Sequence, residues 1–125
     1  MKSRENLVRL KMFQANEKRR QLGQIEMMVA DFERMANELD AQIASEERKS
    51  GITDINHFAY PTFAKAARQR RDNLITSQAG LMAQKAGAEA ALAEAQAELA
   101  RAEALENRDP RSRDADADGR RAVAI

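Results

Sequence analysis

Residues 22–43 read LGQIEMMVADFERMANELDAQI, and apolar side chains recur in this stretch at every third or fourth position. The recurring residues are Leu22, Ile25, Val29, Phe32, Ala36, Leu39 and Ile43. This spacing is the heptad pattern of a helix that buries one narrow stripe against another helix. The stretch therefore predicts a long helix that needs a partner helix.

A second heptad stripe follows Pro61, and alanine fills much of it. Its positions are Leu74, Gln78, Leu81, Lys85, Ala88, Leu92, Ala95, Leu99 and Ala102. Between the two stripes, Gly51 is suited to end a helix and Pro61 is tolerated in the first turn of the next. We therefore expect an all-α fold in which residues 1–107 form an antiparallel coiled-coil hairpin, with a helix at about 3–49, a tip at 50–61 and a helix at about 62–107. Residues 108–125 mix charges with little apolar content, which predicts a disordered tail.

The distribution of charge indicates how the two helices pair. Residues 2–20 carry seven basic and two acidic side chains, whereas residues 89–106 carry five glutamates and one arginine. These stretches complement each other only if the helices run antiparallel, with facing residue numbers that add to about 110. Because an exposed ion pair contributes only ~0.2–1 kcal/mol, the charges select the orientation more than they stabilise the fold.

The first stripe meets basic residues when it is extended upstream of Leu22. The heptad spacing there falls on Lys18, Ala15, Lys11 and Val8, whereas the large apolar residues lie off it. One interpretation is a local stutter, in which the stripe shifts around the helix and the second helix compensates. The other is a surface for a partner protein, formed by Leu7, Leu10, Phe13, Lys18, Arg19 and Arg20.

Three of the five aromatic residues, Phe58, Tyr60 and Phe63, lie within the tip or directly after it. One interpretation is that they pack under the chain reversal and hold it in place. The alternative is that an exposed aromatic set anchors a partner, because such residues dominate the energetics of interfaces.

The composition argues against catalysis and cofactor binding. The sequence has no cysteine, one histidine (His57) and no glycine-rich phosphate loop, so we expect no catalytic, metal or cofactor site and no enzymatic activity. A lone histidine beside Asn56 and Phe58 is more often a structural or solvated residue than a general base.

The charges and the apolar runs also restrict the partners. The formal net charge is +1, and the basic clusters at 18–20 and 68–71 face acidic stretches in the expected register, so intramolecular pairing is favoured over nucleic-acid binding. No apolar run approaches the roughly 20 residues of a membrane span, and the first residues lack the apolar stretch of a signal peptide. We therefore expect a cytoplasmic protein without direct membrane insertion.

Several segments resemble one family of coiled-coil proteins. Residues 1–13 (MKSRENLVRLKMF), 17–22 (EKRRQL), 25–28 (IEMM) and 58–64 (FAYPTFA) resemble the FliJ-type flagellar export proteins in their alphaproteobacterial form, over roughly residues 1–107. The resemblance implies a cytoplasmic component of the flagellar type III export apparatus, and hence a role in motility. By this analogy the antiparallel coiled coil is similar to the central stalk of rotary ATPases, and Leu7, Leu10 and Phe13 are sensible contacts to the ATPase ring.

The partners and the location implied by the resemblance are specific. They are the flagellar export ATPase and its regulator, the export gate protein and the substrate chaperones, at the cytoplasmic face of the inner membrane. The alternative from the heptad pattern alone is a general coiled-coil scaffold or a spacer that associates with itself.

Overall fold

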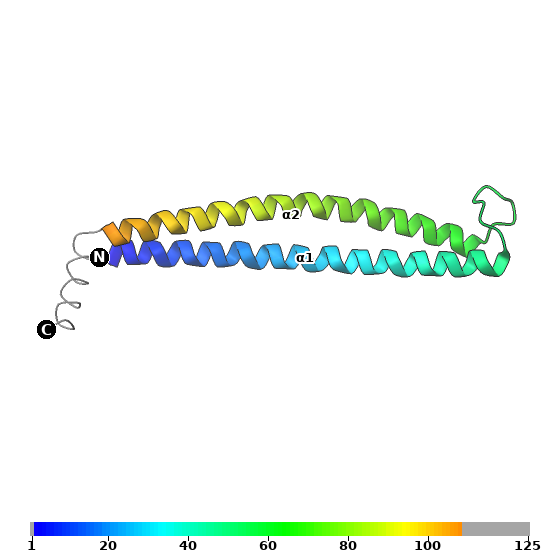
Figure 1. Cartoon of the computed structure of the whole chain (residues 1–125), viewed down its shortest axis with the longest axis horizontal. Helices are drawn as coiled ribbons and strands as arrows, with labels where there is room; N and C mark the ends of the chain where they lie inside the picture. The colour runs from blue at the N-terminus through cyan, green and yellow to red at the C-terminus, as the bar shows by residue number, and fades with distance from the viewer. Residues whose placement is uncertain (1, 109–125) are drawn as a thin grey trace. The chain divides into compact units, whose positions relative to one another are not determined.

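Two long helices make up nearly all of the described chain. The computed structural model describes residues 2–108, in which α1 spans Lys2–Ser50 and α2 spans Thr62–Arg108 (Figure 1). No strand occurs within this range. The expected all-α class with two long helices is therefore confirmed. The tail expected at 108–125 lies outside the described residues except for Arg108, which is the last residue of α2.

The end of α1 follows from the geometry of one glycine. Gly51 has a φ of 72°, a conformation that residues with a Cβ atom rarely adopt, and its N–H donates to the carbonyl of Glu47 at 2.8 Å. The hydroxyl of Ser50 donates to the same carbonyl at 3.2 Å. Before α2, Pro61 supplies a carbonyl that accepts the N–H of Lys65 at 3.0 Å. The helix ends are thus fixed by local hydrogen bonds, as the turn residues indicated.

The chain divides into two compact units, which we name by position. The terminal unit comprises Met1–Leu22 and Gly87–Ile125, and the tip unit comprises Gly23–Ala86. Within each unit α1 and α2 run antiparallel, and each unit has a direct contact between the helices. In the terminal unit Lys11 Nζ donates to Glu98 Oε2 at 3.1 Å, and in the tip unit an Arg71 guanidinium N–H donates to Asp40 Oδ1 at 2.9 Å. These pairs have residue numbers that add to 109 and 111, in agreement with the expected register of about 110.

The tip unit contains the apolar core. Leu39, Ile43 and Ala67 form a buried cluster, and Leu74 packs against it. Further along the pair, the side-chain amide of Gln78 donates to the backbone carbonyl of Val29 at 3.5 Å. The heptad stripe of residues 22–43 is buried or half-buried throughout, so it faces α2 as its spacing predicted.

The terminal unit keeps the same heptad phase. Ala15 is 2% exposed and Lys11 and Lys18 are half-buried, whereas Leu10 is 49% exposed and Phe13 is 63% exposed. The stutter interpretation is therefore wrong for these residues, because the stripe does not shift around the helix. A half-buried lysine is tolerated in the seam because its aliphatic stem can be buried while its amine reaches a polar group, as Lys11 reaches Glu98.

Candidate partner-binding surfaces

The first candidate surface lies on α1 in the terminal unit, and we call its residues Leu7, Leu10, Phe13, Lys18, Arg19 and Arg20 the terminal surface. Leu7, Leu10 and Phe13 follow one another at intervals of three and so lie on adjoining parts of one helix face. Leu7 is half-buried, and the other two are exposed. The unit therefore presents two large apolar side chains that the pairing with α2 does not cover.

Two basic residues of the terminal surface, Arg19 and Arg20, bond within their own helix. Arg20 donates two hydrogen bonds to the carboxylate of Glu17, at 2.9 and 3.4 Å, and Arg19 donates one to the side chain of Asn16 at 3.1 Å. The hydrogen bond from Arg20, followed by its charge, lowers the pKa of Glu17. Arg20 thus pairs within the chain, as expected, but its partner lies three positions away on α1 and not on α2.

A groove beside the terminal surface was not expected from the sequence. It has a volume of about 510 Å³ and lies between α1 and α2 within the terminal unit. Its lining is formed by Phe13, Gln14, Glu17, Lys18, Gln21, Ala91, Glu94, Ala95 and Glu98. The sequence feature that could have predicted this groove is the small size of Ala91 and Ala95, which leaves space next to the longer side chains of α1.

The second candidate surface lies at the tip, where Tyr60 is set apart from the other two aromatic residues. Tyr60 is 7% exposed, its hydroxyl donates to Glu47 Oε2 at 3.2 Å, and it accepts from Arg68 Nε at 2.8 Å. Arg68 also donates to Glu47 Oε2 at 3.0 Å, and its guanidinium lies 5.9 Å from the centre of the Tyr60 ring. The hydrogen bond to Tyr60, followed by that to Glu47, raises the pKa of Arg68. We call these three residues the tip latch, because they join the tip to both helices.

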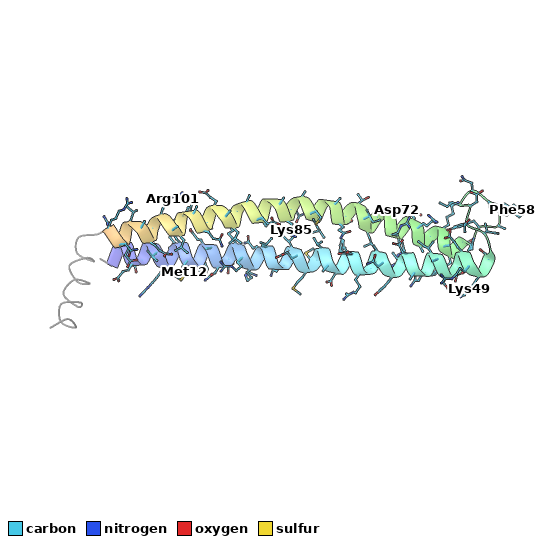
Figure 2. The ribbon with its side chains drawn as sticks, in the orientation of Figure 1. Met12, Lys49, Phe58, Asp72, Lys85 and Arg101 are labelled. Carbon is cyan, nitrogen blue, oxygen red and sulfur yellow. The ribbon has the colours of Figure 1, made fainter. Side chains whose placement is uncertain are left out.

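Phe58 and Phe63 do not pack under the reversal. Phe58 is 97% exposed and points away from the helices (Figure 2), while Phe63 is 56% exposed. The packing interpretation is therefore right for Tyr60 and wrong for these two residues. The ring of Phe58 stacks on the ring of His57, with the ring centres 4.8 Å apart.

The loop that carries Phe58 is held by its own hydrogen bonds. Asp54 accepts the N–H of Asn56 on its carboxylate at 3.0 Å and the N–H of His57 on its carbonyl at 3.1 Å. His57 Nδ1 in turn accepts the N–H of Ala59 at 3.0 Å. His57 thus has a structural place in the loop, which agrees with its interpretation from the sequence.

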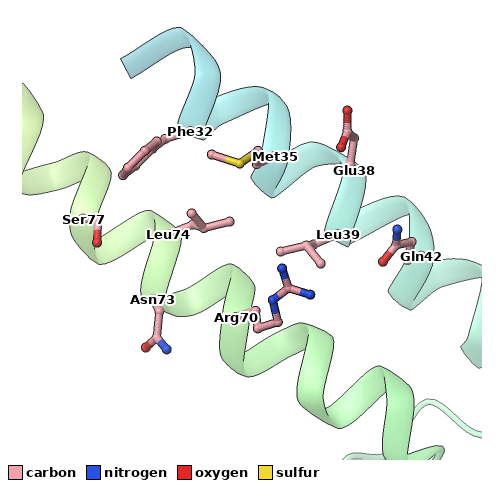
Figure 3. A pocket seen from close by; sticks show the side chains of 9 residues that line it. All are labelled: Phe32, Met35, Glu38, Leu39, Gln42, Arg70, Asn73, Leu74 and Ser77. Carbon is pink, nitrogen blue, oxygen red and sulfur yellow. The ribbon is translucent and has the colours of Figure 1, made fainter. Parts of the chain in front are cut away.

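The tip unit also contains an open groove on one side of the helix pair. It has a volume of about 400 Å³, and Figure 3 shows Phe32, Leu39 and Leu74 between the two helices. Met35 lines the groove from α1, and Arg70 lines it from α2. The sequence reasoning placed the leucines in the stripe but gave no indication that this side stays open.

The part of the chain that the structure describes offers no group of three or more histidine or acidic side chains placed to hold a metal ion. Neither α1 nor α2 has a segment that is apolar enough over a sufficient length to cross a membrane. No family model, no curated protein and no solved structure matches this chain. The fold and the two surfaces are therefore the observations from which a function is argued.

Proposed function

We propose that this chain is a non-enzymatic coiled-coil component of a flagellar type III protein export apparatus. In this role it links the export ATPase and its regulator to the export gate protein and accompanies substrate chaperones, at the cytoplasmic face of the inner membrane. The proposal is supported by the resemblance of residues 1–13 and 58–64 to FliJ-type proteins. It is also supported by the antiparallel pairing of α1 and α2, which leaves the surfaces described above exposed.

The exposure of Leu10 and Phe13 is the observation that carries the proposal. The heptad phase is unbroken on either side of them, so these residues are excluded from the helix pair by their positions and not by a local irregularity. Exposed apolar side chains that the fold does not use are typical of surfaces that bind another protein. Their basic neighbours favour approach to an acidic partner surface.

Binding to the purified hexameric export ATPase tests the proposal. The full chain is expected to bind, and a Leu10→Ser/Phe13→Ser variant is expected to bind at least about tenfold more weakly, because burial of each side chain contributes about 1.5–3 kcal/mol. The matched control is Met27→Ser/Met28→Ser, which removes two exposed apolar residues of α1 in the tip unit. Circular dichroism of all variants establishes that helicity is unchanged.

The proposal fails if the unaltered chain does not bind the ATPase and a strain without the gene swims normally. If the Leu10→Ser/Phe13→Ser variant binds as tightly as the unaltered chain, the terminal surface is not the ATPase contact, and the proposal loses the observation that carries it and rests on the resemblance alone.

A spacer that associates with itself is the second candidate, and the open groove at Phe32, Met35 and Leu74 favours it. Sedimentation of the purified chain separates the two candidates. A stable dimer that persists at high salt, with no affinity for the ATPase, would favour the spacer.

A further inference from the structure

The apolar stripe of α1 is wider in the tip unit than a pair of helices needs. A two-helix coiled coil buries two positions in every seven residues, whereas helices of larger bundles carry a third apolar position. In α1 the third position is taken by Met28 and Met35. Each of them directly precedes a residue of the heptad stripe, Val29 or Ala36. Met28 is 46% exposed and Met35 is 36% exposed, so α2 leaves both of them partly uncovered.

The two sides of the helix pair differ within the tip unit. On one side α1 carries an acidic residue at every seventh position, and these residues are Glu26, Glu33, Asp40 and Glu47. Two of these acids form ion pairs with arginines of α2, at 2.9 Å for Asp40 and 3.0 Å for Glu47. The other side, where Met35 lies, has the open groove of about 400 Å³. Ion pairs therefore join the helices on one side, and the other side is left open.

The open groove carries one residue of each charge, on opposite walls. Glu38 lines it from α1 and Arg70 lines it from α2, as Figure 3 shows, and the other lining residues are uncharged. Both side chains are exposed, and neither has a hydrogen bond or ion pair with another residue of the described range. The α1 wall of the groove is thus acidic and the α2 wall is basic, at the same level along the helices.

We propose that a second copy of this chain covers the groove, in a parallel dimer with both tips at the same end. The two-fold axis of this dimer runs parallel to the helices, so the α1 wall of each groove lies over the α2 wall of the other at the same level. Glu38 of each copy then faces Arg70 of the other, and the dimer contains this contact twice. Met35 of each copy is covered by the apolar lining of the other groove.

The signs of the two charges select this orientation. A two-fold axis across the helices, centred on the groove, would bring Glu38 against Glu38 and Arg70 against Arg70, and like charges at an interface are unfavourable. With the axis parallel to the helices, both contacts join opposite charges. A second copy therefore supplies by symmetry both charges that the groove requires.

The tip unit is also large enough for a stable dimer. At a rise of ~1.5 Å per residue, residues 23–50 of α1 are ~40 Å long, and two helices each ~10 Å wide present a face of ~800 Å². A stable protein interface buries about this area on each side. Such a dimer gives the self-association considered above a definite face and orientation, and it rests on that second candidate and not on the export function.

Reversal of the two charges in the full chain tests the proposal. The unaltered chain is expected to sediment as a dimer at about 100 μM. Glu38→Arg and Arg70→Glu each place like charges opposite each other at both contacts, so each is expected to weaken the dimer about tenfold. The double variant Glu38→Arg/Arg70→Glu restores opposite charges, and its dimer is expected to be as stable as that of the unaltered chain.

A mixture of the two single variants separates a contact between copies from one within a copy. At these two positions the Glu38→Arg chain carries two cations and the Arg70→Glu chain carries two carboxylates. Opposite charges therefore meet only between unlike chains. Native mass spectrometry of the mixture is expected to show the heterodimer in preference to either homodimer.

Truncation of a groove methionine tests the apolar part of the interface. Met35→Ser is expected to weaken the dimer about tenfold, because its side chain is buried only when the second copy is bound. The matched control is Ile75→Ser, which removes a side chain of the tip unit that is 48% exposed and does not line the groove. This control is expected to leave the dimer unchanged, and circular dichroism establishes that all variants keep their helicity.

Four results would overturn the proposal. They are a chain that stays monomeric at about 100 μM, single reversals that associate as strongly as the unaltered chain, a mixture without preference for the heterodimer, and equal effects of Met35→Ser and Ile75→Ser. A monomer that binds the export ATPase overturns the dimer and leaves the export function in place. A dimer with the expected charge dependence that does not bind the ATPase supports the dimer and overturns the export function alone.

Discussion

The tip unit and the terminal unit follow one heptad phase but bury different side chains. The tip unit buries Leu39, Ile43 and Leu81, whereas the buried apolar residues of the terminal unit are Ala15, Ala95 and Ala102. An alanine removes much less apolar surface from water than a leucine, so the terminal unit gains less stability from its helix pair. The difference shows that a regular heptad pattern sets which face of a helix is turned inward, while the residues on that face set how firmly the pair holds.

The two units differ in the polarity of one seam position of the heptad on each helix. On α1, the seam position that recurs every seven residues is basic up to Lys18 and apolar from Ile25 onwards. The boundary between the two units lies between these two residues. On α2 the corresponding row is polar at Arg71, Gln78 and Lys85 and apolar at Leu92 and Leu99. Each unit therefore carries one polar row in its seam, contributed by α1 in the terminal unit and by α2 in the tip unit. Polar residues in a seam select register and orientation at a cost in stability.

The largest expected effect comes from truncating one leucine in each unit. Leu39→Ala removes a buried side chain from the tip core and is expected to lower the free energy of unfolding by about 2–3 kcal/mol. Leu99→Ala removes a half-buried side chain of the terminal unit and is expected to cost only about 1 kcal/mol. Urea denaturation followed by circular dichroism measures both, and equal losses would contradict the proposed difference in packing between the units.

Breaking the tip latch has the next largest expected effect. Arg68→Gln removes a cation that bonds both Tyr60 and Glu47 and leaves the half-buried carboxylate without its partner, so a loss of about 1–2 kcal/mol is expected. Tyr60→Phe, which keeps the ring and removes the hydroxyl, is expected to cost less. If both variants unfold at the same urea concentration as the unaltered chain, the latch does not contribute to the stability of the tip unit.

Replacing the lysines of the seam is expected to make the terminal unit resemble the tip unit. In Lys11→Leu/Lys18→Leu two half-buried polar positions become apolar, and the gain from burial exceeds the loss of the Lys11–Glu98 ion pair. We expect a stabilisation of about 1 kcal/mol, measured by urea denaturation. Sedimentation is expected to show additional association, because the polar row no longer selects one partner and one orientation. An unchanged or lower stability would show that the lysines fit the seam as well as leucines.

Much of the fold could be predicted from the sequence, because it depends on local signals. The heptad spacing of residues 22–43 predicted which face of α1 is turned towards α2, and Gly51 and Pro61 predicted where the chain reverses. The opposite charges of the two helices predicted the antiparallel register. Of the two interpretations of the upstream stripe, the stutter was wrong because lysine stems are apolar enough to lie in a seam and Glu98 is within reach of Lys11.

The surfaces were harder to predict than the fold. The sequence grouped Phe58, Tyr60 and Phe63, but it could not show that only Tyr60 turns inward, since this depends on Arg68 and Glu47 meeting it from two different helices. The open grooves depend on which side of the pair lacks large residues, and so on the three-dimensional register as well as the spacing.

The smallest expected effect concerns pH and the Arg20–Glu17 pair of the terminal unit. Because Arg20 lowers the pKa of Glu17 below its ordinary value of 4.5, the stabilisation from this pair is present above that value and is lost as the pH falls through the lowered pKa. Arg20→Gln removes the pair, so its stability is expected to lie slightly below that of the unaltered chain at pH 7. The difference between the two chains is then expected to shrink in acid.

Urea midpoints measured at pH 7 and well below 4.5 test this, and a difference that stays constant would mean that Glu17 titrates without regard to Arg20. Arg34→Gln is the matched control, because Arg34 also pairs with an acidic residue three positions earlier but lies in the tip unit.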